Sequence, residues 1–150
     1  MGNFILAGVD LILWRHADAE DGADDLARRL TRKGEEQAAA MAKWLRPRLP
    51  SNLTLLASPA VRAQQTAAAL GVKVITEPTL APGASVAAIV QAAEKHAGLV
   101  IVVGHQPDLG RAAARFAGAL GEWHIDKGAI CWLVGGMPAR IKALLPPELL

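Results

Sequence analysis

The chain has 150 residues, of which 52% are hydrophobic and 20% are charged, and its formal net charge is +2 at pH 7. This composition excludes a disordered chain, and the length suits one globular domain with a buried core, which we expect to span residues 1–150. Because the basic residues are scattered and form no block, we expect neither a nucleic acid nor a membrane surface as a partner.

The single cysteine and the N-terminal stretch indicate in which cellular compartment the protein is expected. Cys131 lies in the apolar segment AICWLV, so no disulfide can form within the chain and we expect a buried thiol. The N-terminal stretch has no basic segment and is interrupted by Asp10, and Leu6 stands where a myristoylation signal needs Ser or Thr. No apolar run reaches the length of a membrane span. We therefore expect a cytoplasmic protein without a signal peptide or lipid anchor.

Apolar, β-branched runs alternate with helical patterns along the chain. In order, the first half predicts a strand at 9–14, a helix at 32–49 with Thr31 as its N-cap, a strand at 52–57, a helix at 59–70 opened by Ser58 and closed by Gly71, and a strand at 72–75. The second half predicts a helix at 86–95 opened by Ser85, a buried strand at 99–103, a helix at 108–119, and strands at 129–134 and 139–144 joined by GGMP.

This alternation, with its short connections, is typical of an α/β protein. We expect a three-layer sandwich in which a mostly parallel central sheet is flanked by helices, with an antiparallel edge hairpin near the C-terminus. The final residues, LPPELL, are expected to be irregular.

Cationic and imidazole side chains follow three of the predicted strands. Arg15 and His16 come directly after the first strand, and Arg62 lies one helical turn into the helix after the second. His105 and Gln106 follow the strand at 99–103. Because ligands of open α/β sheets bind beyond the carboxyl ends of the strands, we expect these side chains to meet at one edge.

A tetrahedral phosphoryl group is the ligand that such a cluster fits. Guanidinium groups bind its oxygens bidentately, and helix N-termini offer backbone N–H groups to an anion. Neutral imidazole attacks phosphorus without first losing a proton, while the arginines and a second histidine neutralise the charge that passes through the transition state. No metal-ligand spacing is present, so we expect neither a metal nor a cofactor.

Each of these residues also has an ordinary structural interpretation. Arg15 could cap a sheet edge, and His16 could be a strand-end histidine with satisfied hydrogen bonds. Arg62 could be an ordinary first-turn helix residue, and His105 a turn residue after Gly104. The convergence of the set, rather than any single member, favours a site. His96 and His124 are expected to face solvent.

Four motifs occur in order along the chain: WRHADA, LTRKGEEQA (30–38), SPAVRAQQTA (58–67) and VVGHQPDLG (102–110). With them the sequence resembles the histidine phosphatase superfamily, which includes the cofactor-dependent phosphoglycerate mutases. More narrowly, its short length resembles the bacterial phosphohistidine phosphatases of the SixA type. The segment DKGAICWL fits the late strand of that family.

The resemblance implies a role for each residue of the cluster. His16 would be the nucleophile that is transiently phosphorylated, and Arg15, Arg62 and His105 would hold the phosphoryl oxygens. Gln106 would offer its backbone N–H to the phosphate.

The same resemblance gives a reason for a glycine near the start of a helix, which costs up to about 1 kcal/mol relative to alanine. Gly34 would pack closely against the turn that carries Arg15 and His16, and Thr31 and Gln37 would be structural.

The chain departs from the family pattern at two places. Ala17 stands where the family usually has glycine. The segment EPTLAPGAS has no carboxylate after Leu80, where larger members carry a general acid, and only Glu77 precedes it. An alkoxide leaves poorly without an acid, whereas a protonated imidazole leaves readily, so this departure favours phosphohistidine as substrate. Asp18 is the candidate proton donor, a role that requires a raised pKa.

The leading hypothesis is a metal-independent phosphatase that acts through a phosphohistidine intermediate. Its substrate would be phosphohistidine on a protein, such as a phosphotransfer or phosphocarrier domain in signal transduction. A small-molecule phosphomonoesterase on the same site is the alternative, and a non-catalytic phosphate-recognition module is a third hypothesis. The sequence leaves the oligomeric state open.

Overall fold

The computed structural model describes residues 8–150, and the Leu6 position considered above lies outside them. Six strands form one sheet in the order β3-β2-β4-β1-β5-β6. They are β1 (Val9–Arg15), β2 (Thr54–Ala57), β3 (Val74–Thr76), β4 (Val100–Gly104), β5 (Ile130–Gly135) and β6 (Arg140–Leu145). The first four strands are parallel, while β5 and β6 are antiparallel and form a hairpin at one edge. This is the predicted mixed sheet.

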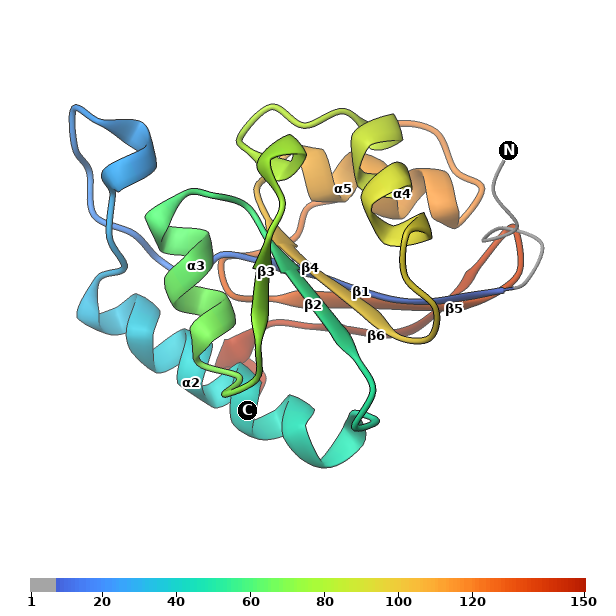
Figure 1. Ribbon diagram of the computed structural model, residues 1–150, viewed down its shortest axis with the longest axis horizontal. Helices are drawn as coiled ribbons and strands as arrows, with labels where there is room; N and C mark the ends of the chain where they lie inside the picture. The colour runs from blue at the N-terminus through green and yellow to red at the C-terminus, as the bar shows by residue number, and fades with distance from the viewer. Residues whose placement is uncertain (1–7) are drawn as a thin grey trace.

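Helices cover both faces of the sheet. The α-helices are α2 (Arg32–Leu45), α3 (Val61–Ala68), α4 (Val86–Glu94) and α5 (Asp108–Phe116), and the 3-10 turns are η1 (Asp25–Ala27), η2 (Arg46–Arg48), η3 (Pro78–Leu80) and η4 (Pro147–Leu149). In Figure 1, α2 and α3 lie on one side of the sheet and α4 and α5 on the other. The predicted three-layer sandwich is confirmed.

The core consists of two apolar layers that share the sheet. Along β1, Leu11 and Leu13 pack in the layer that contains Phe116, while Ile12 and Trp14 pack in the other. A strand buried on both faces has no polar alternation. This explains why the first and fourth strands are nearly continuous apolar runs.

The predicted N-caps of two helices are confirmed. Thr31 accepts a hydrogen bond from the Gly34 N–H at 3.0 Å, and Ser85 accepts one from the Ala88 N–H at 3.0 Å. The first helix ends earlier than predicted, at Leu45, and continues only as the turn η2. Pro47 has no N–H to extend the α-helical hydrogen bonds.

The prediction that Ser58 caps the following helix is wrong. Helix α3 begins at Val61 after Ala60, which makes no side-chain cap, and it ends at Ala68 before Gly71 with its φ of 80°. The Ser58 hydroxyl lies outside the helix and accepts a hydrogen bond from the Ala60 N–H at 3.1 Å. Tertiary contacts of Ser58, described below, override the local capping pattern.

The structure also differs from the predictions at the end of one helix and in the C-terminal segment. Helix α5 ends at Phe116 rather than near residue 119, and the C-terminal segment expected to be irregular contains the turn η4. Cys131 is buried, and burial raises the pKa of its thiol to about 11, as expected of a structural cysteine. Within residues 8–150, no helix combines the length and apolar character that crossing a bilayer requires.

Candidate active site

The carboxyl ends of three parallel strands meet at one edge of the sheet. Arg15 pairs with Gly104 between β1 and β4, and Ala57 pairs with Val103 between β2 and β4. The His16 N–H continues this pairing by donating to the Gly104 carbonyl at 3.0 Å. The residues that follow the three strands are therefore brought together, as predicted.

His16 is buried, with 7% of its surface exposed. Its Nδ1 lies 2.7 Å from the carbonyl oxygen of Ala17. Because a carbonyl only accepts, Nδ1 carries the proton and Nε2 keeps its lone pair. Burial lowers the pKa of His16 to about 4, and the charges of Arg62 and Arg15 act in the same direction. The imidazole is thus neutral at pH 7, with a lone pair on Nε2.

Arg62 lies between the two histidines and is buried. Its Nε donates to Nε2 of His16 at 3.3 Å, and one Nη lies 3.4 Å from Nδ1 of His105. The rings of His16 and His105 have centroids 5.2 Å apart. A single guanidinium therefore contacts both imidazoles, which is the geometry expected around one small anion.

His105 is held by Ser58. Since a guanidinium only donates, Nδ1 of His105 accepts from Arg62 and its Nε2 carries the proton, which it donates to the Ser58 hydroxyl at 2.8 Å. Burial lowers the pKa of His105 to about 3, and the electrostatic interactions with His16 and with the Arg62 guanidinium act in the same direction. Ser58 is thus a positioning residue for His105, a role that its sequence context did not indicate.

Arg15 lies close enough to lower the pKa of both histidines. One of its Nη atoms donates to the Ile125 carbonyl at 2.9 Å, and its own pKa is lowered by burial. Its Nε is buried and has no acceptor among the described residues. A buried donor without an acceptor costs about 1–3 kcal/mol, so a ligand oxygen at this position would be stabilised.

Gln106 has a structural role that the sequence did not reveal. Its side-chain amide donates to the Trp123 carbonyl at 3.0 Å and accepts from the Gly110 N–H at 2.8 Å, which ties a loop to α5. Among the described residues, no acceptor contacts its backbone N–H. The phosphate contact implied by the resemblance stays a prediction.

Asp18 is engaged in structural contacts. Its carboxylate forms an ion pair with Lys127 at 2.9 Å and accepts from the Thr31 hydroxyl at 2.8 Å. These two hydrogen bonds lower the pKa of Asp18. The raised pKa that a proton donor requires is not found at this residue.

The turn after His16 is held by the residues expected to be structural. The Asp18 N–H donates to the Gln37 side chain at 2.9 Å, and a Cβ at Gly34 would overlap the carbonyl oxygen of Asp18. Glycine is therefore required where α2 meets this turn. The predicted close packing of Gly34 is confirmed.

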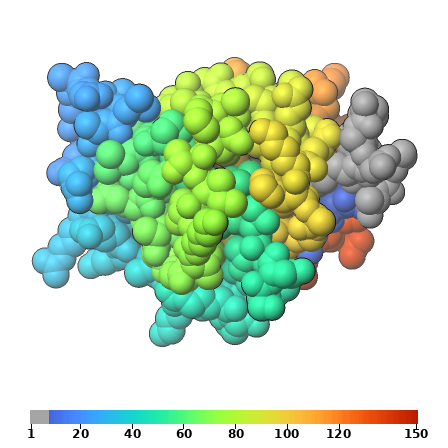
Figure 2. Space-filling view, in the orientation of Figure 1, coloured from blue at the N-terminus to red at the C-terminus, as the bar shows by residue number. Residues whose placement is uncertain are grey.

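Asp25 is a site residue that the sequence did not reveal. Its carbonyl oxygen accepts from Arg62 at 2.7 Å, and its carboxylate lies 3.2 Å from Arg62 and 3.0 Å from Arg28. The bond from Arg28 and, after it, the bond from Arg62 lower its pKa. Asp25 lies in the segment between Ala19 and Leu30, which are joined by an antiparallel bridge. Figure 2 shows this blue segment as a projecting corner of the molecule.

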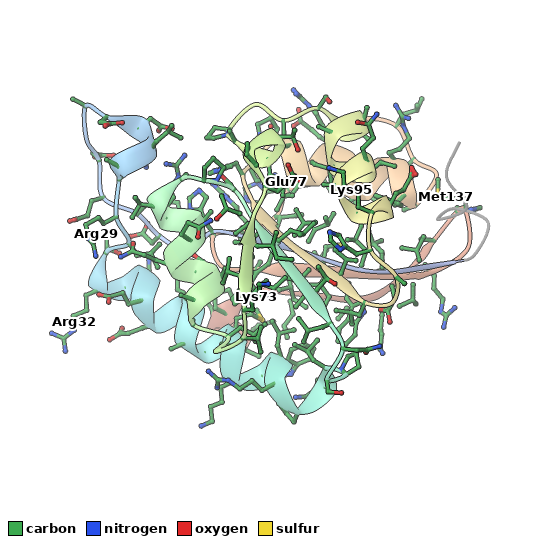
Figure 3. The ribbon with its side chains drawn as sticks, viewed as in Figure 1. Arg29, Arg32, Lys73, Glu77, Lys95 and Met137 are labelled. Carbon is green, nitrogen blue, oxygen red and sulfur yellow. The ribbon has the colours of Figure 1, made fainter. Side chains whose placement is uncertain are left out.

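The remaining titratable residues that the sequence raised lie in other contacts. His124 is exposed and pairs with Asp126 at 2.8 Å, whereas His96 is half-buried rather than fully solvent-facing. Glu77 accepts from Thr79 and forms an ion pair with Lys95 at 3.4 Å (Figure 3). Among residues 8–150, no three His, Cys, Asp or Glu side chains are grouped so that they could hold a metal ion.

Comparison with known sequences identifies the class of protein to which this fold and site belong. The sequence pattern of the histidine phosphatase superfamily (branch 1) matches residues 11–82. An uncharacterized protein from Picosynechococcus is 35% identical over 155 residues, which span 94% of this chain and 93% of that protein. The chain belongs to the histidine phosphatase superfamily, and membership supports phosphatase activity on a phosphorylated molecule.

Solved structures of SixA proteins have the same fold over nearly the whole chain. The SixA protein of Nakamurella multipartitia is 27% identical, with a TM-score of 0.79 over 93% of this chain and 96% of that one. The protein histidine phosphatase SixA, solved in complex with tungstate, is 25% identical, with a TM-score of 0.82 over 94% of this chain and 99% of that one.

Proposed function

We propose that residues 1–150 form a metal-independent phosphatase that removes the phosphoryl group from phosphohistidine on a protein, through a phosphoenzyme at His16. One observation carries the proposal. Nε2 of a neutral, buried His16 has its lone pair directly beside the Arg62 guanidinium. The structural similarity to a SixA protein that binds tungstate, an oxyanion, supports the same ligand class here.

In the first step, Nε2 of His16 attacks phosphorus and the bond between phosphorus and the substrate imidazole breaks. The substrate ring, protonated on its other nitrogen, leaves as a neutral imidazole. The proton on Nδ1 of His16 stays on that nitrogen, hydrogen-bonded to the Ala17 carbonyl, so the phosphorylated ring becomes a cation. Arg15 and Arg62 neutralise the phosphoryl oxygens as charge passes through the transition state.

His105 would change protonation state when the anion binds. A phosphoryl dianion next to Nδ1 favours uptake of a proton from solvent there, while the Nε2 proton stays on the ring and is donated to the Ser58 hydroxyl. Protonated His105 then donates a hydrogen bond to a phosphoryl oxygen.

In the second step, water attacks phosphorus and His16 leaves. Because Nδ1 is still protonated, the leaving group is a neutral imidazole, and the free enzyme is restored without a further proton transfer to the ring. The protons of the attacking water stay on the product phosphate, and His105 returns its added proton to solvent when that phosphate leaves.

A small-molecule phosphomonoesterase is the second candidate, and one observation favours it. Asp25 brings a carboxylate to Arg62, the type of group that alkyl-phosphate hydrolysis needs as a general acid. Arg28 and Arg62 keep this carboxylate ionised, however, which suits proton acceptance better than proton donation. The ionised state of Asp25 therefore favours a substrate whose leaving group departs without a general acid.

The test compares kcat/KM for a phosphohistidine-containing phosphocarrier protein, phosphoramidate and a set of alkyl phosphates. We expect the phosphoramidate bond to be preferred and His16→Ala to abolish turnover. A preference for alkyl esters would favour the second candidate. Tight tungstate binding without turnover of any substrate would instead favour the phosphate-recognition module.

A further inference from the structure

A cavity of about 480 Å³ lies beside the phosphoryl site. Its walls come from the end of β1, the first turns of α2, the loop before β5, and η4. This size is in the range of pockets that hold small molecules or side chains. We refer to it as the Arg15 pocket, because Arg15 lines it.

Arg15 joins this pocket to the phosphoryl site. Its charge acts on His16 and His105 on one side and interacts with Asp126 of the pocket on the other. The Gly128 N–H donates to the carbonyls of both Arg15 and His16 at 3.1 Å, which fixes the pocket loop against the His16 turn. The pocket and the phosphoryl site therefore share Arg15 and are held together by this loop.

The pocket has an excess of positive charge. Its lining has three cations, Arg15, Lys33 and Lys127, and two carboxylates, Asp126 and Glu148. Lys127 is already paired with Asp18 at 2.9 Å, and the contact of His124 with Asp126 at 2.8 Å is an ion pair only when His124 is protonated. In the part of the chain that the structure describes, the other two lining cations, Arg15 and Lys33, make no ion pair with a carboxylate. Among residues 8–150, Glu148 forms no ion pair either. An anionic group near Arg15 and Lys33 would offset this excess.

We propose that the Arg15 pocket binds a carboxylate of the substrate while His16, Arg62 and His105 hold the phosphoryl group. The inference rests on the proposed function and adds the substrate class, which is a phosphorylated molecule with an acidic group a few bonds from phosphorus. That carboxylate is an acidic side chain next to phosphohistidine on a protein, or part of a small metabolite. Lys33 is the specificity-determining residue.

A homologous series of probes tests the pocket by calorimetry. The probes are methylphosphonate and phosphonates that carry a terminal carboxylate on two, three or four methylene groups. We expect at least one carboxylate probe to bind about five- to tenfold more tightly than methylphosphonate, because charge-assisted hydrogen bonds are the strong ones. Equal affinities across the series would overturn the proposal.

Matched variants then assign the gain to the pocket. Lys33→Gln should remove most of the affinity gain of the best carboxylate probe over methylphosphonate. Arg32→Gln makes the same charge change one residue away, on a side chain that points away from the molecule (Figure 3) and is 94% exposed. Arg32→Gln should leave this affinity gain unchanged. An equal loss in both variants would mean long-range charge rather than a pocket, and would overturn the proposal.

Two kinds of substrate identify the source of the carboxylate. Phosphohistidine peptides with flanking Asp or Glu are compared with Asn and Gln analogues, beside phosphorylated small carboxylic acids. The proposal is supported if the carboxylate strengthens binding in either kind of substrate and Lys33→Gln removes this effect. It is contradicted if the carboxylate strengthens binding in neither kind. Failure of the proposed function is a separate result: wild-type protein without turnover, or His16→Ala with full turnover, regardless of the probe affinities.

Discussion

Nε of Arg62 donates to Nε2 of His16 at 3.3 Å, so the most buried cation of the site directly contacts the nitrogen that holds the lone pair. Burial is the main reason why the pKa of His16 is low, and the Arg62 charge adds to it. The contact also orients Nε2 toward the place where an anion would bind Arg62. His16 follows β1 and Arg62 lies in α3 after β2, and these two strands are consecutive in the chain but lie on either side of β4 in the sheet.

Arg62→Ala should lower kcat by about 10²–10³-fold and weaken tungstate binding, because it removes a preorganised donor for the phosphoryl oxygens. Arg62→Lys should recover only a small part, since an ammonium cannot contact both histidines in the way a guanidinium does. Steady-state kinetics and calorimetry measure the two effects. Arg115→Ala, on an exposed arginine of α5, is the control. Comparable losses in the control would contradict a direct role for Arg62.

Asp25→Asn should tighten tungstate binding by about two- to fivefold. The carboxylate of Asp25 occupies Arg62 donors that an oxyanion would use, and exposed ion pairs of this type contribute about 0.2–1 kcal/mol. Asp24→Asn removes the neighbouring carboxylate, which contacts neither arginine. Weaker binding in Asp25→Asn, or an equal gain in Asp24→Asn, would contradict competition between Asp25 and the ligand.

Gly34→Ala should destabilise the fold by about 1–3 kcal/mol, because the new Cβ would overlap the Asp18 carbonyl oxygen. Helix propensity alone predicts the opposite sign, a gain of up to about 1 kcal/mol. Urea unfolding decides between them. Gly136→Ala, at a glycine with open space around its Cβ position, should change stability little.

The free energy of unfolding should fall as the pH is lowered from about 6.5 to 4.5. His16 and His105 have folded-state pKa values of about 4 and about 3, below the 6.5 of an unperturbed histidine. In this range the unfolded chain takes up protons that the folded chain does not, so protonation favours unfolding. Urea titrations at several pH values measure the slope, and His105→Gln should reduce it. A slope unchanged by that substitution would contradict the buried neutral state of His105.

The sequence predicted the sheet and the meeting of His16, Arg62 and His105 because both depend on regular patterns. Apolar runs identify strands, and parallel strands bring the residues after them to one edge. The partner of Arg62 could not be found in this way. Asp25 is 37 residues from Arg62 and lies in a segment with no apolar periodicity. Ser58 shows the same limit, since a local capping pattern cannot show that His105 will bind its hydroxyl.

The central claim is that His16 carries the phosphoryl group, and rapid-quench mass spectrometry after mixing with phosphoramidate tests it most directly. We expect the wild-type chain to gain the mass of one phosphoryl group on His16, in a bond that acid cleaves and alkali spares. His16→Ala should show neither this adduct nor turnover. Sustained turnover by His16→Ala, or a wild-type phosphoryl group located on another residue, would contradict the proposed function.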